Sequence, residues 1–453
     1  MLLAFRVINF YKPSSKKYVN STPNSTTTPS NQSAASTPPL STQSSMDHTG
    51  TDQDKQVTSS SGRSYNRQPP WIRSTSQPAP WRQHNGEFKE ISDGNWTYCY
   101  DSESGGGTPI KGFGNVPIVS YEDIAKMPDR RLRVSSITWN MNEKSVKILN
   151  YLATKVNENY DDLDSDVIFL CLQEIPSTAK TFHEDALKIL EPVLKTHSLY
   201  LSHRAWSQMV VVFIRRQHLK YAIQPQVSFI ASGAMAKPVR TKGAIAVCFR
   251  LYQRWIVFIG CHLSHATSQQ RIQDYTKIVK TLRFASLKKF HATGNDDLFS
   301  SDVVFWSGDL NFRVTNENNI DWKDFDKIGT EVYDRILEEE ELATTRARGV
   351  AFSEFAESPI RFAPTHKFEP DTDIYVAKRI PSFTDRVLFW SRNPEWVQSF
   401  KYDSLRGPCP SDHKPVFGTF WLTVINKPIP KKYYSADSKS SMLSTGENFN
   451  GVL

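Results

Sequence analysis

Short apolar runs recur from Arg131 onward, and their lengths most constrain how this chain can fold. Runs of this kind, bounded by polar and turn-forming residues, are typical of β-strands. We expect strands at Leu132–Trp139, Val167–Leu172, Met209–Ile214, Ala244–Arg250, Trp255–Leu263, Val303–Trp306, Val387–Trp390 and Pro415–Leu422. We expect helices at Glu143–Asn157, Thr181–Thr196, Gln269–Leu287 and Asp321–Leu342. Strands often follow one another without a helix between them, so the predicted fold class is α/β, with two mixed β-sheets packed as a sandwich and helices on the outside.

The N-terminal region has a different composition. Between Ser14 and about Gln68 the chain consists mainly of Ser, Thr, Pro, Asn and Gln. Such a segment buries too little apolar surface to offset its ordering entropy, so we expect it to be disordered. The domain prediction is therefore a disordered Ser/Thr/Pro-rich leader over residues 1–115, a folded domain over residues 116–425 and a flexible polar tail over residues 426–453.

Two similar pieces in this leader, around Trp71 and Trp81, place Trp beside Pro and Arg. Trp and Arg are enriched at the energetic centres of protein interfaces, so one interpretation is a short docking motif for a protein partner. The alternative is a linker whose tryptophans pack back on the folded domain. Both interpretations fit the sequence equally well.

The chain carries a formal net charge of +8, which suggests an anionic partner such as nucleic acid, anionic lipid or a soluble polyphosphate. Its five cysteines are scattered without any C-x-x-C pair, which favours a reducing compartment over a disulfide framework. No apolar run approaches the roughly 20 residues that span a bilayer. We also expect no signal peptide and no prenylation, and the protein is predicted to be a cytoplasmic monomer.

The apolar run Val303-Val-Phe305 is followed at once by Trp306-Ser-Gly-Asp-Leu-Asn-Phe-Arg313. The run predicts a buried strand that a turn at Gly308 ends. Asp309 and Asn311 are two residues apart, so their side chains are expected to face the same way at the end of the strand. Asp and Asn also occur in turns for purely local reasons, so this pair means little alone.

Four other short segments place polar residues just beyond apolar strands. The residues are Asn140, Glu174, His262, Asp412 and His413. Together with the preceding Asp and Asn they supply carboxylates, carboxamides and imidazoles at the ends of strands. Mg²⁺ takes oxygen ligands, and one or two protein carboxylates suffice to bind it. The set therefore suits the hydrolysis of a phosphate ester with a divalent metal.

Three blocks, in this order, resemble the inositol polyphosphate 5-phosphatase family, within the wider Mg-dependent endonuclease/exonuclease/phosphatase fold. They are Trp306–Arg313, Pro381-Ser-Phe-Thr-Asp-Arg386 and Ser411-Asp-His-Lys-Pro-Val416. The resemblance covers Arg131 to about Phe420, and it implies the α/β sandwich of that family. A polar leader followed by one catalytic domain is most similar to the lipid-directed type IV branch of the family.

The resemblance implies a role for each polar residue. Glu174 and Asn140 correspond to the metal site, with Mg²⁺ as the expected cofactor. Asp309 corresponds to the family residue that orients or deprotonates the attacking water. Asn311 corresponds to its partner, which donates to the phosphate in the transition state.

The remaining catalytic candidates are imidazoles and carboxylates. His262 and His413 are expected to donate to phosphate oxygens. Asp412 precedes His413, and in the family a carboxylate of this kind orients a catalytic imidazole. Asp385 corresponds to an inner-site residue with Arg386 in a structural role, although an Asp beside an Arg also fits an ordinary surface ion pair.

Four residues are predicted to bind substrate through the same resemblance. Lys242 falls in a block similar to the family's N-K-G, and Pro364-Thr-His-Lys367 is similar to its P-T-Y-K, whose Tyr and Lys help to bind the neighbouring 4-phosphate. Arg379 falls at another 4-phosphate contact. His366 replaces the family's Tyr and thereby brings a group that titrates near neutral pH into this contact. The other departures, none of which removes a catalytic group, are Thr241 for Asn, Phe383 for Trp and Cys261 for Ser.

The resemblance predicts a Mg-dependent phosphatase that removes the 5-phosphate of phosphoinositides, such as phosphatidylinositol 4,5-bisphosphate and 3,4,5-trisphosphate. The expected partners are phosphoinositide lipids at a cytoplasmic membrane surface, and not nucleic acid. One alternative is a Mg-dependent nuclease of the same superfold, which the basic charge suits and which Lys367 and Arg379 argue against. The other is a non-catalytic phosphoinositide-binding scaffold, which the complete set of polar strand-end residues argues against.

Overall fold

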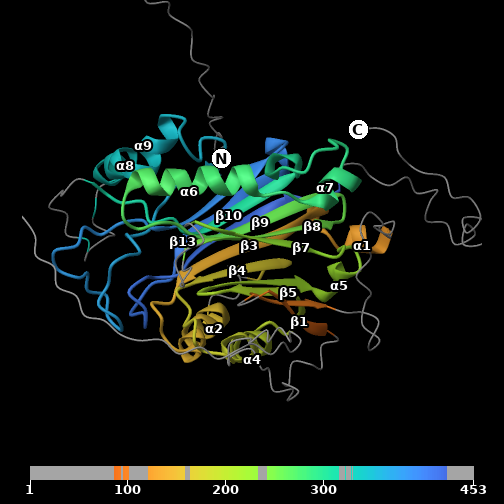
Figure 1. Cartoon of the computed structure of the whole chain (residues 1–453), viewed down its shortest axis with the longest axis horizontal. Coiled ribbons are helices and arrows are strands. Elements are labelled where there is room, and N and C mark those ends of the chain that lie inside the picture. The colour runs from red at the N-terminus through yellow and green to blue at the C-terminus, as the bar shows by residue number, and fades with distance from the viewer. Residues whose placement is uncertain are drawn as a thin grey trace, which may run out of the picture. The chain divides into compact units, whose positions relative to one another are not determined.

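The computed structural model describes residues 86–92, 95–100, 121–158, 164–232, 242–315, 322, 328 and 330–425. The motifs around Trp71 and Trp81, Thr241 and the polar tail lie outside the described residues. Among the described residues, a pair of β-sheets packs face to face, and helices lie on the outer side of each sheet (Figure 1). This arrangement confirms the predicted α/β sandwich.

One sheet has eight strands in the order β1-β2-β5-β6-β4-β3-β14-β13. Its strands are β1 (Gly86–Ser92), β2 (Asn95–Tyr100), β3 (Arg131–Asn140), β4 (Val167–Gln173), β5 (His197–Ala205), β6 (Gln208–Arg215), β13 (Val397–Ser404) and β14 (Val416–Thr423). β3 and β4 run parallel to each other, whereas the flanking pairs β14–β3 and β4–β6 are antiparallel. The sheet is therefore mixed, as expected.

The other sheet has six strands in the order β11-β12-β10-β9-β8-β7. Its strands are β7 (Gln226–Ala231), β8 (Gly243–Leu251), β9 (Arg254–His262), β10 (Val303–Asp309), β11 (Ala356–Glu357) and β12 (Asp385–Ser391). The central strands β9 and β10 are parallel, and β12 is antiparallel to β10. This mixed pairing decides which strand ends meet at the site described below.

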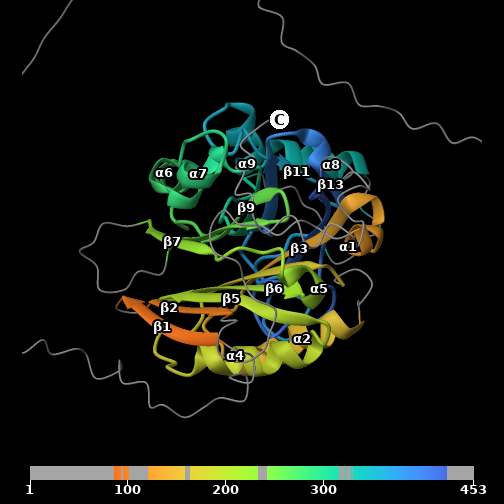
Figure 2. The same ribbon diagram turned by 90° about the vertical axis from the view of Figure 1, so that its right-hand side faces the viewer.

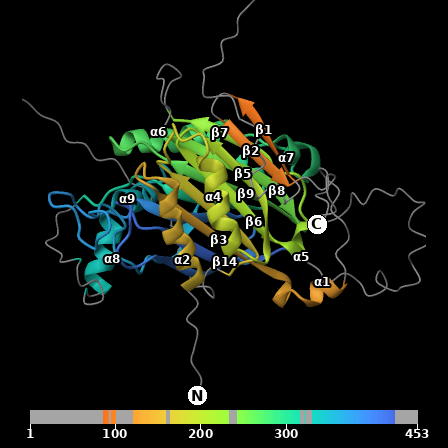
Figure 3. The ribbon, with the colours of Figure 1, turned by 90° about the horizontal axis from the view of Figure 1, so that it is seen from below.

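The helices lie outside the sandwich. They are α1 (Tyr121–Ala125), α2 (Leu149–Glu158), α4 (Phe182–Leu190), α5 (Arg216–Leu219), α6 (Ser268–Thr281), α7 (Ala285–Phe290), α8 (Thr330–Glu339) and α9 (Glu341–Ala347). Helices α2 and α4 lie side by side over the eight-stranded sheet, whereas α6, α7 and α9 lie on the side of the six-stranded sheet (Figures 2 and 3).

Aromatic residues fill the layer between the sheets. The rings of Phe169 and Phe258 stack 4.8 Å apart, and Phe258 stacks on Phe305 at 5.3 Å. Gly260 of β9 lies close to the facing sheet, because a Cβ there would lie 2.5 Å from the Cys171 Sγ of β4. Such packing stabilises the sandwich because it removes large apolar surfaces from water.

The predicted turn at Gly308 is wrong. Strand β10 continues through Gly308 and ends at Asp309, still in register with both neighbours. Gly308 has φ +155°, and a Cβ there would lie 2.1 Å from the carbonyl oxygen of Cys261. Glycine is needed here for the close approach of β9 and for its backbone angle, not for a turn.

Each predicted long helix is shorter or divided in the structure. The helix expected from Thr181 ends at Leu190, and Pro192 then lies in a 3₁₀ turn, since proline lacks the N–H that would continue the α-helix. The helix expected over residues 269–287 breaks between α6 and α7, where the backbone of Leu282 is extended. The helix expected over residues 321–342 is interrupted at Glu340. The carboxylate of Glu340 accepts hydrogen bonds from N–H groups in the first turn of α9 and so begins a new helix.

Several strands had no apolar signal strong enough to predict. β5 contains Ser, His and Arg although its residues are buried, and β13 is a polar edge strand. The hairpin β1–β2 pairs with β5 through β2, so strands of the sheet begin at Gly86, before the expected start of the folded unit near Val116. Aromatic residues alternate with polar ones in Asn95–Tyr100, a pattern that favours a strand.

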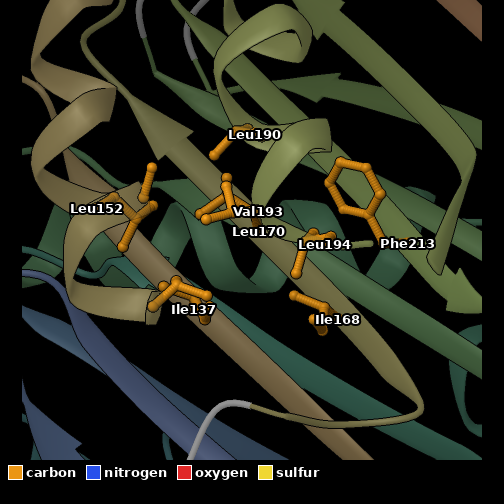
Figure 4. A pocket seen from close by; sticks show the side chains of 10 residues that line it. Ile137, Leu152, Ile168, Leu170, Leu190, Val193, Leu194 and Phe213 are labelled. Carbon is orange, nitrogen blue, oxygen red and sulfur yellow. The ribbon is translucent and has the colours of Figure 1, made fainter. Parts of the chain in front are cut away.

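An apolar cavity lies between the helical layer and the eight-stranded sheet (Figure 4). Its volume is only about 20 Å³, and its lining includes Leu152 of α2, Leu190 of α4 and Phe213 of β6. It contains no polar side chain suited to chemistry. Among the described residues, no helix combines the length and the apolar character needed to span a membrane.

Candidate active site

Three neighbouring strands of the six-stranded sheet each place a polar residue at the same end of the sheet. Asp309, the last residue of β10, lies in register between His262, the last residue of β9, and Asp385, the first residue of β12. This happens because β9 runs parallel to β10 while β12 runs against it. All three residues are buried. The sheet register therefore gathers residues that are far apart in the sequence.

The eight-stranded sheet contributes residues at the same place. Asn140 ends β3, Glu174 follows the neighbouring β4, and His413 lies just before β14, which is the other neighbour of β3. The Nδ2 of Asn140 donates a hydrogen bond of 3.0 Å to Oδ2 of Asp309. This bond joins the two sheets, and it brings the predicted residues of both sheets into one site.

Asp309 is the centre of the site. Its Oδ2 accepts from Asn140 and lies 3.2 Å from Nε2 of His262, and its Oδ1 accepts from the backbone N–H of Asn311 at 3.0 Å. Burial alone would raise the pKa of Asp309, but the close contact with His262 and the charges of His413 and Lys242 hold it well below its usual range. Asp309 is therefore an ionised carboxylate of fixed orientation.

His413 is held by a carboxylate. Its Nδ1 donates to Oδ2 of Asp385 at 2.9 Å, and the same oxygen accepts from the hydroxyl groups of Thr365 at 2.7 Å and Thr384 at 2.9 Å. Burial lowers the pKa of His413, but the charge and hydrogen bond of Asp385 and the charge of Asp309 outweigh it and raise that pKa to about 9. His413 is accordingly a cation at neutral pH.

The carboxylate that orients His413 is thus Asp385 and not the adjacent Asp412. Asp412 Oδ2 instead pairs with the ammonium of Lys367 at 2.9 Å. Asp385 also makes no ion pair with Arg386, whose buried guanidinium binds the carboxylates of Glu340 and Glu357. The surface ion pair that the adjacent Asp and Arg also suggested is therefore wrong, because both residues are buried and face different partners.

Lys242, His262 and Glu174 form a second contact group. The ammonium of Lys242 contacts Nε2 of His262, and Oε1 of Glu174 lies 3.7 Å from Lys242 Nζ and 3.6 Å from His262 Nε2. Burial and then the charge of Lys242 lower the pKa of His262. Burial also lowers the pKa of Lys242. His262 is therefore neutral, beside one cation and one partly exposed carboxylate.

The predicted phosphate-binding residues lie at the rim of this site. The ring of His366 lies 4.3 Å from the ring of His413, and its Nδ1 accepts from Arg313 at 3.0 Å. Burial and the charges of His413 and Arg313 hold the pKa of His366 far below its usual range. The expectation of a group titrating near neutral pH is therefore wrong. Arg379 is exposed and, within the described residues, its side chain does not join this network.

Sequence reasoning missed three supporting residues. Thr365 and Thr384 hold the carboxylate of Asp385, and Arg313 contacts both Asn311 and His366. All three lie inside the sequence blocks that resemble the family, next to predicted site residues. This position was the only feature of the sequence that could have indicated a role in the site. Their bonding partners are distant in sequence and could not be identified from it.

Several side chains of the site offer ligand atoms for a metal ion. Among the described residues, potential ligand atoms of Asp309, Asp385 and His413 lie within 4.8 Å of one another, and of these the two carboxylates can bind a metal ion, because the His413 imidazolium has no free lone pair. The Oδ1 of Asp385 is buried and has no hydrogen-bond partner among those residues. Glu174 and Asn140 add a carboxylate and a carboxamide oxygen next to this group, so the donor set is rich in the oxygen atoms that hard cations prefer.

Comparison with known proteins gives a family and a fold. The profile of endonuclease/exonuclease/phosphatase family 2 matches residues 137–419, which include every site residue described above. The chain is similar to the phosphatidylinositol polyphosphate 5-phosphatase type IV of Mus musculus, with 27% identity over 319 residues that cover 68% of this chain and 48% of that protein. The chain thus spans about half the length of this curated relative.

Two solved structures illustrate the fold. The inositol polyphosphate 5-phosphatase domain of synaptojanin, in complex with inositol (1,4)-bisphosphate and calcium ion, matches with a TM-score of 0.52 and 23% identity, over 64% of this chain and 84% of that chain. A nitrophorin of Cimex, in a ferrous NO complex, matches with a TM-score of 0.52 and 22% identity, over 65% of this chain and 100% of that chain. Since proteins of such different chemistry share the fold, the activity must be argued from the site.

Proposed function

This chain belongs to endonuclease/exonuclease/phosphatase family 2, and we propose that it is a metal-dependent phosphatase that removes the 5-phosphate of phosphoinositides. The observation that carries the proposal is the buried His413–Asp385 pair beside the ionised Asp309, where the two sheets meet. The names of the type IV relative and of the synaptojanin domain support a phosphoinositide substrate. The proposed substrates include phosphatidylinositol 4,5-bisphosphate and 3,4,5-trisphosphate.

Asp309 is proposed to orient the attacking water. Asn140 and the backbone N–H of Asn311 donate to its carboxylate, and His262 lies 3.2 Å from it, so a water bound to the carboxylate has a defined direction toward the phosphorus. A carboxylate with so low a pKa is a weak base. Its contribution is therefore orientation and negative charge next to the water's proton, rather than strong proton abstraction.

The donors around Asp309 are proposed to bind the phosphate oxygens. Phosphoryl transfer places negative charge on those oxygens, and fixed donors in a buried site stabilise it. His413 is positively charged, and its bond to Asp385 through Nδ1 leaves Nε2–H to donate to substrate. Lys242 supplies a second charge, and Asn311 supplies an amide N–H.

Mg²⁺ is the proposed cofactor, with Glu174 and Asn140 as its protein ligands. The partnerless buried Oδ1 of Asp385 supports a site that receives an additional polar group. When bound, such an ion neutralises charge on the phosphate and on the leaving oxygen. Glu174 is partly exposed and next to His262, a position that suits access from solvent.

We further propose that residues 116–425 contain the whole catalytic domain, with β1 and β2 as added edge strands, and that it acts as a monomer at a cytoplasmic membrane face. The net charge of +8 also favours a nuclease of the same family, because nucleic acid is a strong polyanion. Lys367 and His366, which lie near His413, instead support a phosphoinositide substrate. They add contacts for a second phosphate close to the phosphate that is removed.

The test is phosphate release from a panel of phosphoinositides and soluble inositol phosphates, with single-stranded and double-stranded DNA and RNA in parallel. Each substrate is assayed with Mg²⁺ and with EDTA, using Asp309→Ala as the inactive control. We expect release from inositides that carry a 5-phosphate, and only with the metal. Cleavage of nucleic acid without such release would favour the nuclease, and tight binding to phosphoinositides without turnover would favour a scaffold.

A further inference from the structure

Arg204, on β5, is a buried arginine that no step of the proposed reaction uses. Only 5% of its surface is exposed, and burial lowers the pKa of its guanidinium to about 10, so the group still carries a charge at neutral pH. Among the described residues, this guanidinium pairs with no carboxylate and donates instead to backbone carbonyl groups. A buried charge is costly unless other groups compensate for it, so these carbonyl groups must supply the compensation.

Three of the four carbonyl groups lie on the loop between Glu174 and helix α4. Nη1 of Arg204 donates to the carbonyl of Ala179 at 2.7 Å, and Nη2 donates to those of Pro176 at 2.8 Å and Ser177 at 3.3 Å. The fourth bond is from Nε to the carbonyl of residue 206, at 3.3 Å. A guanidinium presents its donors in a fixed planar fork, so these bonds also fix the positions of the carbonyl groups relative to one another. Arg204 therefore holds the chain directly after Glu174.

The backbone of Glu174 has a conformation that needs such support. Its φ is +50°, in the left-handed region that residues with a Cβ rarely adopt. A conformation of this kind persists only where the surrounding structure holds it. The carbonyl of Glu174 accepts from the N–H of Glu143 at 2.7 Å, and the N–H of Ile175 donates to the carbonyl of Ser207 at 3.0 Å. Release of the following loop would let Glu174 return toward an extended backbone and would turn its side chain in another direction.

The side chain of Glu174 has little support of its own. Its Oε1 lies 3.6 Å from Nε2 of His262 and 3.7 Å from Nζ of Lys242, and its side chain is 33% exposed. Both contacts are longer than an ordinary hydrogen bond, so they hold the carboxylate only loosely. The direction of the carboxylate therefore depends mainly on the backbone that carries it, and through that backbone on the loop that Arg204 holds.

We propose that Arg204 is a positioning residue for the metal site: by holding the loop of residues 176–179 it keeps Glu174 in its left-handed conformation and directs the carboxylate toward the ion. That Glu174 binds a metal ion rests on the proposed function, whereas the hold of Arg204 on the loop does not. Removing a group that orients a metal ligand typically weakens metal binding about ten- to a hundredfold. The expected effect of Arg204 is therefore on metal affinity, and not on the chemical step once the metal is saturating.

The first experiment needs neither metal nor substrate. Hydrogen–deuterium exchange of the metal-free protein is measured by mass spectrometry in the wild type and in Arg204→Lys, which keeps the charge but not the fork. Backbone amides of residues 173–182 and of Glu143 should exchange at least about tenfold faster in the variant, the factor for one lost hydrogen bond to a charged group.

The matched control for this experiment is Arg254→Lys. Arg254, at the start of β9, is also a buried arginine whose pKa burial lowers to about 10, and it donates to the backbone carbonyl of Thr423, away from Glu174. Its replacement should leave exchange over residues 173–182 unchanged. Unchanged exchange in Arg204→Lys, or the same increase in both variants, would overturn the inference.

The second experiment measures metal binding without substrate. The probe is Mn²⁺, a paramagnetic substitute for Mg²⁺, and electron paramagnetic resonance reports the free ion. Arg204→Lys should weaken Mn²⁺ binding about ten- to a hundredfold, and Arg254→Lys less than about threefold. In the phosphatase assay, the Mg²⁺ concentration for the half-maximal rate should rise by a similar factor in Arg204→Lys, while kcat at saturating Mg²⁺ stays within about threefold of the wild type. A general loss of structure would instead lower kcat at every metal concentration.

Failure of the inference and failure of the proposed function are distinguishable. Faster exchange in Arg204→Lys with unchanged Mn²⁺ affinity, or a wild type that binds no Mn²⁺, would overturn the inference whatever the activity of the enzyme. If the wild type releases no phosphate from any phosphoinositide but exchange and Mn²⁺ binding respond as expected, the proposed function fails and the inference about Arg204 stands.

A second variant covers the case in which Arg204→Lys does not fold. Ser177 is exposed, and Ser177→Gly loosens the same loop while Arg204 stays in place. The added backbone freedom should weaken Mn²⁺ binding about two- to fivefold. In that case, an unchanged Mn²⁺ affinity in Ser177→Gly would overturn the inference.

Discussion

Nδ1 of His413 donates to Oδ2 of Asp385 at 2.9 Å, although 28 positions separate the two residues in the sequence. The bond fixes the orientation of the imidazole and favours its charged form. Two threonine hydroxyl groups hold the same carboxylate oxygen, so the pair is rigid. A cation of fixed orientation beside Asp309 is a suitable donor to a phosphate.

The pH profile should depend on Asp385. His413 has its pKa raised to about 9, so its charge is present at neutral pH and is lost as the pH rises through 9. Activity that needs this charge should decline on the alkaline side near that value. In Asp385→Asn the decline should move to lower pH, because the carboxylate no longer stabilises the imidazolium, and kcat at neutral pH should fall at least ~10²-fold. Asp334→Asn, at an exposed ion pair, is the control. An unchanged alkaline limb in Asp385→Asn would contradict the role of the pair.

Asp309→Ala should abolish most turnover while the protein stays folded. The carboxylate accepts from Asn140 and Asn311, and its loss removes the group that directs the water. We expect kcat to fall at least ~10²-fold, the size of loss that a misplaced reacting group can cause. Circular dichroism and thermal melting check that folding persists. Near-normal turnover in a folded Asp309→Ala would rule out the assignment.

Metal removal should stop the reaction. EDTA is expected to abolish phosphate release, and added Mg²⁺ to restore it. Glu174→Gln should raise the Mg²⁺ concentration needed for the half-maximal rate, because an amide is a weaker ligand than a carboxylate. The exposed Glu369→Gln serves as the matched control. Full activity in chelator would exclude a metal-dependent mechanism.

Acid should destabilise the fold in a defined pH window. Burial lowers the pKa of His203, on β5, from 6.5 to about 4. Below pH 6.5 the unfolded chain binds a proton that folded His203 accepts only near pH 4, so stability falls across this window as the pH falls. The full effect is about 3 kcal/mol, from roughly 1.36 kcal/mol per pKa unit. Urea denaturation at several pH values measures it. His203→Gln should flatten the dependence, whereas the exposed His265→Gln should not; equal slopes in all three proteins would refute the assignment.

Truncation should separate the leader from the catalytic domain. A chain that starts at residue 85 keeps the β1–β2 hairpin, whereas one that starts at Ile110 removes two edge strands from the eight-stranded sheet. Every site residue described above lies after residue 116, so we expect both chains to hydrolyse a soluble short-chain substrate, with a lower melting temperature for the shorter one. Loss of activity in a folded chain from Ile110 would show that the leader contributes to the site.

The sequence by itself determined the type of fold and the inventory of the site. Apolar runs of strand length fixed most strands of the sandwich, since burial in a sheet requires such runs wherever both faces are covered. Asp309, His262 and Asn140 were recognisable because each is a polar residue directly after such a run. Polar strands such as β5 escaped this reasoning, because their burial depends on neighbours that the sequence does not name.

Only the tertiary structure determined which site residues form hydrogen bonds with one another. The position of Asp412 next to His413 pointed to the wrong carboxylate, because sequence neighbours at an extended segment face different ways, and the register of β12 brings Asp385 instead. The bond from Asn140 to Asp309 crosses between sheets, and the fork of Arg313 reaches His366 across a separation of 53 residues. A hydrogen bond requires its two atoms to lie about 3 Å apart. Which groups come this close depends on the register of the sheets and on packing, and both are set jointly by segments that are distant in the sequence.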